Sequence, residues 1–150
     1  MATSKIAARD WIFQVPIGSG PTWTAVKGLS SFSPNFGDKV QETETTDFDS
    51  AGQFEQVVMQ RGGSIKLEGL RRIDKATGLA DPGQGYLDAL AQGLADNSVG
   101  QIRFRHTTEV QWRVWSVTAK AAEQGGDTNA MSKWGMEITR TGAETLVAAP

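Results

Sequence analysis

The sequence contains no cysteine and only one histidine, His106, among its 150 residues. The absence of cysteine excludes disulfides, thiolate zinc sites, iron–sulfur clusters and cysteine nucleophiles. A single histidine excludes metal sites built from several histidines and acid–base schemes that need a histidine pair. These absences leave few routes to metal or nucleophilic chemistry.

Long apolar runs and a strong charge of one sign are also absent. No stretch approaches the ~18 apolar residues of a membrane helix, and residues 1–10 lack the apolar segment of a secretory signal. Lys and Arg number 15 against 17 Asp and Glu, so the net charge of −2 gives no bulk attraction to nucleic acid or to an anionic membrane. We therefore expect a soluble single domain over residues 1–150, with enough hydrophobic residues (39%) to form a core.

Alternation of apolar and polar residues predicts β-strands over most of the chain. Turn signals such as Gly125-Gly126-Asp127 separate the segments. We predict strands over residues 10–17, 22–26, 54–60, 64–71, 101–108, 110–121 and 132–140. In the segment 110–121 the apolar phase switches, so that Trp112 and Trp115 fall on opposite faces. This switch indicates a bulge, or a strand whose second face is covered by a neighbouring molecule.

One helix is well marked. Asp81 suits the N-cap, Pro82 the first helical position, and Gln84 the return contact of a capping box. The apolar residues that follow share one helical face: Leu87, Leu90, Ala91 and Leu94. We predict a helix over residues 82–97 that flanks a mainly β fold. The expected architecture is an antiparallel β-sandwich or barrel of about seven or eight strands.

Residues 36–54 do not follow this pattern. Val40–Thr46 has extended-chain residues but is polar on both faces, so it cannot close onto a core of its own. Aromatic residues are spaced through the segment, whereas purely disordered linkers tend to lack them. We predict a long extended loop over 36–54 that becomes ordered against a partner.

Charge is distributed unevenly along the chain. Residues 38–55 carry six acids and one lysine, a net charge of −5. Residues 61–75 carry five bases and two acids, and residues 103–120 carry four bases and one acid, a net charge of +3 in each case. These charges either neutralise one another within one molecule or form complementary patches between copies. The polar segment favours the second interpretation.

Few residues suggest a chemical site. His106 shares a strand face with apolar residues and has no nucleophile motif beside it, so we expect a structural role. The stretch 47–52 lacks the third carboxylate and the terminal glutamate of a calcium loop. Glu42 and Glu44 form a same-face acid pair of the kind that is usually solvated. In the stretch 102–106, alternation separates the arginines from the phenylalanine, whereas a nucleic-acid platform needs both on one face.

Several motifs together resemble the major tail tube proteins of long-tailed bacteriophages. They are the first strand with its tryptophan (10–17), the hairpin exit Trp23-Thr24-Ala25-Val26-Lys27-Gly28-Leu29, the stretch Glu44-Thr45-Thr46-Asp47-Phe48-Asp49-Ser50-Ala51-Gly52, the helix start Asp81-Pro82-Gly83-Gln84, and the late Trp134 strand followed by Thr141-Gly142. The Thr-Thr-Asp-Phe-Asp-Ser stretch is the most specific of these. The order of strands, helix and strands matches over almost the whole chain.

The resemblance implies a structural virion protein that is not an enzyme and needs no cofactor. Six copies would form a ring, rings would stack into the tail tube, and DNA would pass through the lumen without being read. The implied partners are further copies of the chain, the tape measure protein, and tail-tip or terminator proteins, with no membrane. The implied location is the virion tail, assembled in the bacterial host cytoplasm.

The resemblance also implies which segments make contacts between subunits. The loop 36–54 would reach a neighbouring ring, assisted by an N-terminal arm (1–9) and a C-terminal tail (143–150). The expected contact residues are acids and aromatics of the loop and bases that could receive them: Phe36, Asp38, Glu42, Glu44, Asp47, Phe48, Asp49, Phe54, Arg61, Arg71 and Arg72.

Two alternatives remain open from the sequence. An inner-tube subunit of a contractile injection system would share the fold and most of the physics. A monomeric β-sandwich that binds a carbohydrate or small apolar ligand through exposed tryptophans is the other alternative, although it gives the polar segment 40–46 no role.

Overall fold

The chain folds mainly into antiparallel β-strands, as predicted. The computed structural model describes residues 2–18 and 22–149. The strands are β1 (Trp11–Ile17), β2 (Thr22–Ala25), β3 (Leu29–Asn35), β4 (Gln41–Glu44), β5 (Gln56–Gln60), β6 (Ser64–Leu70), β7 (Val99–His106), β8 (Gln111–Ala121), β9 (Lys133–Arg140) and β10 (Thr145–Ala148). The helix α1 spans Pro82–Gln92, and 3₁₀ turns lie at Ala8–Asp10 (η1), Phe48–Ser50 (η2) and Ala95–Ser98 (η3).

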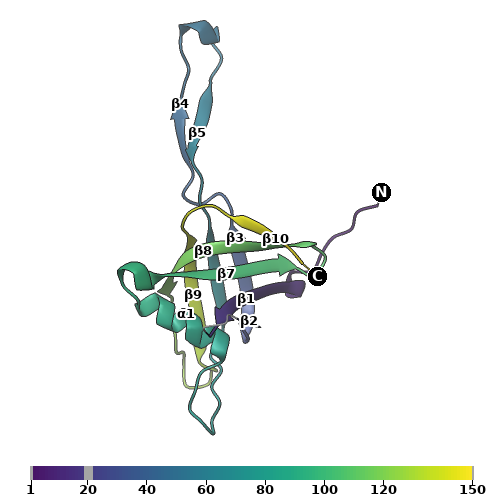
Figure 1. The fold of residues 1–150 in the computed structure, drawn as a ribbon, viewed down its shortest axis with the longest axis vertical. Coiled ribbons are helices and arrows are strands. Elements are labelled where there is room, and N and C mark those ends of the chain that lie inside the picture. The colour runs from purple at the N-terminus through teal and green to yellow at the C-terminus, as the bar shows by residue number, and fades with distance from the viewer. Residues whose placement is uncertain (1, 19–21, 150) are drawn as a thin grey trace.

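Eight of these strands form one antiparallel sheet that folds over itself. Its order is β2-β1-β7-β8-β9-β6-β3, and β10 pairs with β8. The first half of β8 pairs with β10 and its last residues pair with β9, so this strand belongs to both layers. In Figure 1, β7 and β8 run across the strands β9 and β3 behind them. The result is a sandwich whose two layers cross steeply.

The interior is apolar and rich in aromatic rings. Inward-facing residues alternate with exposed ones along the core strand β6, where Ile65 and Leu67 are buried while Lys66 and Glu68 are exposed. The largest fully buried side chains include Trp115, Trp134 and Phe104. The core cluster consists of Phe13, Val15, Val26, Ile65, Leu67, Leu87, Leu90, Ile102, Phe104, Trp115, Val117, Trp134, Met136 and Ile138.

Helix α1 begins where the sequence predicts and buries its apolar face in this core. The Asp81 carboxylate accepts a hydrogen bond from the Gln84 backbone N–H at 3.4 Å, and Pro82 occupies the first turn. Leu87 and Leu90 are buried. Trp134 Nε1–H donates to the Asp88 carboxylate at 3.0 Å, which ties the helix to β9.

The predicted capping-box role of Gln84 is wrong. Its side chain is fully buried and accepts a hydrogen bond from the Arg72 backbone N–H at 3.1 Å. Its amide nitrogen donates to the carbonyl oxygens of Lys27 and Leu70, both at 2.9 Å. Gln84 therefore joins the helix to two backbone segments, the one at Lys27 and the one at Leu70 and Arg72.

Helix α1 is shorter than predicted. It ends at Gln92 rather than at residue 97, and a 3₁₀ turn follows. Leu94, which the sequence places on the apolar helical face, is 82% exposed. At Gly93 the backbone carbonyl of Asn97 occupies the space that a Cβ would need, so the chain folds back on itself at this glycine.

Apart from β4, which lies in the predicted extended loop, two strands lie outside the predicted set. β3 has the sequence Leu-Ser-Ser-Phe-Ser-Pro-Asn, whose serines hide the alternation; it lies at the edge of the sheet, where its proline is tolerated. β10 lies within the predicted C-terminal tail 143–150 and pairs with β8 from Thr145 to Ala148. Tertiary pairing, rather than local propensity, makes both segments strands.

Replacing Gln84 with alanine should destabilise the fold. The change removes the acceptor for the Arg72 N–H and the donor to the Lys27 and Leu70 carbonyls at a part-buried site, so we expect the free energy of unfolding to fall by ~2–4 kcal/mol. Urea denaturation followed by tryptophan fluorescence measures the loss. Gln92→Ala, at the exposed end of the same helix, should change it by less than about 0.5 kcal/mol. Equal effects of the two changes would argue against this role of Gln84.

Candidate functional site

A hairpin arm projects from the sandwich where the sequence predicts an extended loop. β4 and β5 pair only with each other, with Thr43 opposite Val57 and Glu44 opposite Gln56. Figure 1 shows the arm leading away from the body. Every residue of both strands is exposed. A two-stranded ribbon with no covered face is marginally stable in water, so this arm is a candidate for contact with another molecule.

The predicted boundaries of this segment need correction. Residues 54–60, predicted as a strand of the body, supply the second strand of the arm instead. The apolar residues responsible for that prediction are exposed: Val57 (46%), Val58 (38%) and Met59 (68%). Extended apolar residues on an arm cannot be distinguished from a core strand by periodicity alone.

The tip of the arm is a turn over residues 47–50 that is held by its own hydrogen bonds, and we call it the knob. The Asp47 carboxylate accepts hydrogen bonds from the Asp49 N–H at 3.0 Å and from the Ser50 hydroxyl at 3.2 Å. The Ser50 hydroxyl oxygen in turn accepts one from the Asp47 N–H at 3.1 Å. Ser50 is buried, whereas the Phe48 side chain is fully exposed (106%). The knob therefore presents a phenyl ring to solvent on a preformed turn.

The root of the arm is fixed to the core. Phe36 lies edge-on to the Trp115 ring, with centroids 5.9 Å apart, and the Arg113 guanidinium lies 4.9 Å from the centre of the Phe36 ring. On the return strand, a Cβ at Gly63 would come within 2.9 Å of Trp115. Phe36 thus anchors the arm to its own body rather than projecting from it, although 46% of the residue is exposed.

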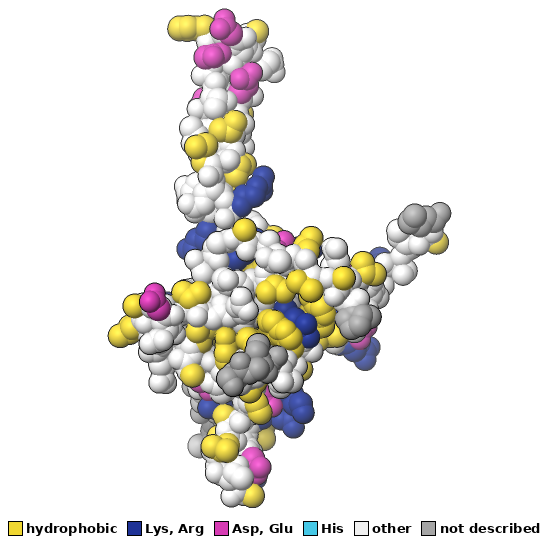
Figure 2. All heavy atoms as spheres, viewed as in Figure 1, with side chains coloured by type: hydrophobic (Ala, Val, Ile, Leu, Met, Phe, Trp, Pro, Cys, Tyr) yellow, Lys and Arg dark blue, Asp and Glu magenta, His cyan; other side chains and the backbone are white. Residues whose placement is uncertain are grey.

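The arm is acidic, and its acids have no ionic partners among the described residues. Ion pairs between described residues join Lys66 to Glu68, Arg71 to Asp88, and Arg113 to both Glu109 and Glu144. None of the arm acids takes part in these pairs: Asp38, Glu42, Glu44, Asp47, Asp49 and Glu55. Figure 2 shows acidic side chains gathered towards the far end of the arm and basic ones near its root and on the body.

The structure separates the predicted basic contact residues. Arg61 is exposed and follows the last strand of the arm, so it lies at the root. Arg72 is exposed beyond the far end of β6. Arg71 is half-buried and ion-paired with Asp88 of the helix, so its charge is used within the molecule. Phe54 lies on the arm and is 67% exposed.

A stack of tryptophan and arginine covers the outer face of the β2-β1-β7-β8 layer. The Arg103 guanidinium lies 4.6 Å from the centre of the Trp23 ring and 4.1 Å from that of Trp112, and Arg105 lies 4.9 Å from Trp112. Burial lowers the pKa of Arg103, and the charge of Arg105 lowers it further. Arg105 also donates to three carbonyls, those of His106, Thr107 and Glu109.

This stack covers part of the second face of β8, where the sequence predicts a neighbouring molecule. The predicted switch of phase is present, because Trp115 lies in the core whereas Trp112 is not part of the core cluster. Yet Trp112 is only 5% exposed within the single chain. Arginines of the adjacent strand supply the cover, an arrangement that alternation alone does not reveal.

The described residues form no recognisable catalytic or metal site. His106 is buried; its Nε2 lies 2.7 Å from the Ala7 carbonyl oxygen and its Nδ1 2.8 Å from the Thr108 hydroxyl, which suits a structural role. No group of three potential metal ligands occurs in residues 2–18 and 22–149. Across the same ranges, no helix is long and apolar enough to span a membrane.

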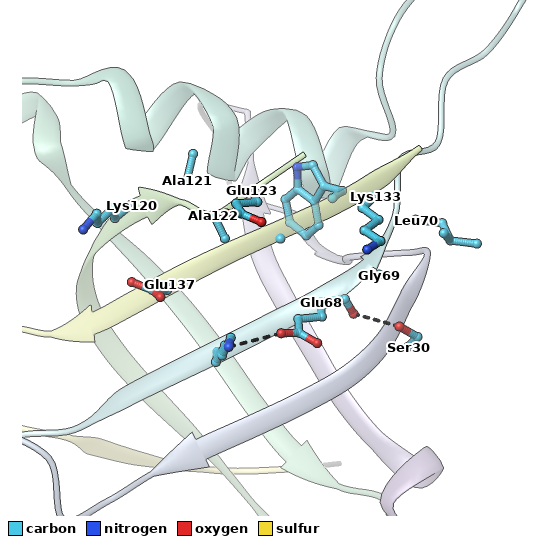
Figure 3. Close-up of a pocket in the computed structure, with 13 residues that line it drawn as sticks. Ser30, Glu68, Gly69, Leu70, Lys120, Ala121, Ala122, Glu123, Lys133 and Glu137 are labelled. Carbon is cyan, nitrogen blue, oxygen red and sulfur yellow. Dashed lines mark hydrogen bonds and ion pairs between the residues drawn. The ribbon is translucent and has the colours of Figure 1, made fainter. Parts of the chain in front are cut away.

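The hollow shown in Figure 3 carries charges of both signs. It has a volume of about 630 Å³ and lies over β6 and β9. Its charged lining residues are Lys66, Glu68, Lys120, Glu123, Lys133 and Glu137. Lys66 pairs with Glu68 at 3.2 Å, and Ser30 donates to the Glu68 carbonyl at 3.3 Å. Balanced charges on a sheet surface describe a solvated face rather than a ligand pocket.

Replacing Asp47 with alanine should loosen the knob without destabilising the body. The change removes the acceptor for the Asp49 N–H, a cap worth about 0.5–2 kcal/mol. We expect faster amide exchange at Asp49 and Ser50, measured by NMR, with an unchanged unfolding midpoint. Asp49→Ala is the matched control, because the side chain of Asp49 makes no hydrogen bond that holds the turn. Unchanged exchange in Asp47→Ala would contradict the capping role.

Comparison with known proteins gives matches in structure only. No protein-family model and no curated protein matches the sequence. A chain from the tail of an empty gene transfer agent particle with C6 symmetry matches with a TM-score of 0.75 and 14% identity, covering 96% of this chain and 100% of the other. A chain from the virion of a native gene transfer agent particle matches with a TM-score of 0.70 and 13% identity, over the same shares. Over nearly its whole length, therefore, this chain has the fold of chains in gene transfer agent particles, one of them from a tail, which agrees with the resemblance in sequence.

Proposed function

We propose that this protein is a structural subunit of a virion tail tube, in which six copies form a ring and rings stack head to tail. The hairpin arm is the observation that carries the proposal. Its strands are exposed on both faces, its acids have no ionic partners among the described residues, and its root is fixed to the core. The shared fold and the sixfold symmetry of one matching tail structure support the number of copies.

Sheet edges offer the contacts within a ring. In the described chain, β2 and β3 end the sheet, and β10 pairs only with β8. Exposed edges invite pairing with other chains, and closing them into a barrel shared by several copies removes that hazard. Ring formation therefore gives these edges partners that the single chain lacks.

Charge offers the contacts between rings. A head-to-tail stack needs two different surfaces that complement each other. The arm supplies the acidic surface, through Asp38, Glu42, Glu44, Asp47 and Asp49. Arg61 and Arg72 are exposed and supply basic groups to receive it, whereas the ion pair with Asp88 leaves Arg71 a smaller part.

The tube would conduct DNA without reading its sequence. The two arginines of β7 are held against tryptophan rings and backbone groups, so they do not form an open phosphate-binding surface. Further partners would be a tape measure protein and tail-tip or terminator proteins at the ends of the tube. Assembly would take place in the cytoplasm of a bacterial host, and the protein would reside in the virion tail.

The proposal predicts that charge on the arm controls stacking. The purified protein should form rings or tubes with an open lumen at high concentration, seen by negative-stain electron microscopy and light scattering. Glu42→Lys with Glu44→Lys should raise the concentration needed for assembly roughly tenfold or more, because the reversed charges meet basic groups of the neighbour. Circular dichroism should show the variant folded.

The control is Asp96→Lys with Asp127→Lys, which changes the net charge equally at exposed acids outside the arm. This variant should assemble like the unchanged protein. Assembly that responds equally to both double changes would point to overall charge rather than to the arm. A protein that stays a single 16.1 kDa species at every concentration, with or without tail-tip partners, would contradict the proposed function.

A further inference from the structure

The sandwich has an open seam at one side. The sheet ends at β2 and β3, and these two strands are not hydrogen-bonded to each other in the described chain. Within that same part, Trp11 and Ile12 of β1 pair only with β7, and β3 pairs only with β6. Between these edges lies a hollow of about 630 Å³, which we call the seam hollow.

The seam hollow is lined mainly by apolar groups. Its walls include Trp11, Phe13, Leu29 and Phe32. Phe32 stands between the other rings, with centroids 5.4 Å from Trp11 and 5.8 Å from Phe13. Trp11, Leu29 and Phe32 are only half-buried, so the edges of the aromatic core are open to solvent here. Apolar surface of this kind gains stability when it is covered.

Among the described residues that line the seam hollow, Arg9 is the one charged residue, and its charge is positive. Other hollows differ in this respect. The one in Figure 3 has three lysines and three glutamates. A third, beside Pro82, is lined by Lys27, Arg72, Asp74 and Asp81. The seam hollow thus suits an aromatic group that carries negative charge beside it.

The knob of the arm has this chemistry. Phe48 is fully exposed, and its neighbours in sequence are both aspartates. Asp47 is occupied in holding the turn, whereas the Asp49 carboxylate takes part in no ion pair between described residues. Because the turn is preformed, little conformational entropy is lost when the ring is buried.

The arm cannot bring its knob to the seam hollow of its own molecule. β3 begins at the hollow, with Leu29, and ends at Asn35 beside the arm root. The arm then continues away from the body, as Figure 1 shows. The hollow lies along the first half of β3, and the knob lies beyond the other end of that strand, at the tip of the arm. A head-to-tail contact between copies requires two such separate surfaces.

We propose that Phe48 of one copy inserts into the seam hollow of a second copy, with Asp49 facing Arg9. This inference rests on the proposed head-to-tail assembly and assigns the apolar contact that holds two copies together. The contact covers two surfaces that each chain leaves open, the phenyl ring at the tip and the half-buried aromatic residues of the seam. Charged contacts along the arm then set the orientation of one copy relative to the next, while the Phe48 side chain supplies buried apolar surface.

Truncation of Phe48 tests the role of its phenyl group. Phe48→Ala should raise the concentration needed for assembly by about 10-fold to 100-fold, the effect of losing one buried phenylalanine. Phe54→Ala is the matched control, since it removes an exposed phenylalanine of the same arm outside the knob, and it should have a several-fold smaller effect. Both variants should keep the unfolding midpoint of the unchanged protein. Equal effects of the two truncations would overturn the assignment of Phe48.

Covalent trapping tests the position, and the absence of natural cysteines makes it clean. A subunit carrying Asp49→Cys and a second carrying Arg9→Cys should form a disulfide-linked dimer when mixed under assembly conditions and oxidised. Asp49→Cys mixed with Lys133→Cys, in the hollow of Figure 3, should not. A dimer formed with Lys133→Cys and not with Arg9→Cys would place the knob in the wrong hollow and refute the inference.

A charge exchange separates this inference from the proposed function. Arg9→Asp and Asp49→Arg should each weaken assembly, and the two together in one chain should restore it, because the pair is then reversed. If the unchanged protein assembles, and neither Phe48→Ala nor the charge exchange alters that assembly, the seam contact is wrong and the proposed tail tube function stands. An unchanged protein that never assembles would overturn both.

Discussion

The packing of Trp115 against both ends of the arm root is the contact on which the rest of the structure depends. The ring is fully buried, lies edge-on to Phe104 at 5.1 Å, and donates its Nε1–H to Glu144 at 2.9 Å. Phe36 approaches it from the start of the arm, and Gly63 lies against it where the arm returns. A strand shared by both layers thus fixes the direction of an arm that contributes no residue to the core.

This arrangement separates folding from assembly. The core cluster of the described body lies on β1, β6, β7, β8, β9 and α1, together with Val26 after β2, and no residue of the arm belongs to it. The arm keeps exposed the acids, the valines of β5 and the phenylalanine at its tip, all of which favour contact with another chain. A subunit built this way would fold alone and still carry uncovered surfaces, which suits the proposed role of a subunit that is added to a tube.

Local patterns predicted those parts of the fold in which one face is buried. Trp134, Met136 and Ile138 alternate because they fill the core, and Asp81 and Pro82 start the helix as expected. The serine-rich β3 was missed, since its pairing with β6 compensates for weak alternation. The arm strand β5 was placed in the body, because three exposed apolar residues imitate a core strand. The polar pattern, the spaced aromatics and the charge identify the acidic segment, but the knob and the seam hollow depend on hydrogen bonds and on a gap between strands that do not pair.

The most direct measurement compares the stability and the assembly of the protein with and without its arm. Lys39 and Gly62 lie close together at the root, so residues 40–60 can be replaced by an Asn-Gly turn. The shortened protein should unfold cooperatively with the same thermal midpoint as the complete chain, and electron microscopy should show no stacked rings at concentrations where the complete chain forms tubes. Tubes from the shortened protein, or a body that no longer unfolds cooperatively, would contradict the separation of a self-sufficient core from an arm that serves assembly.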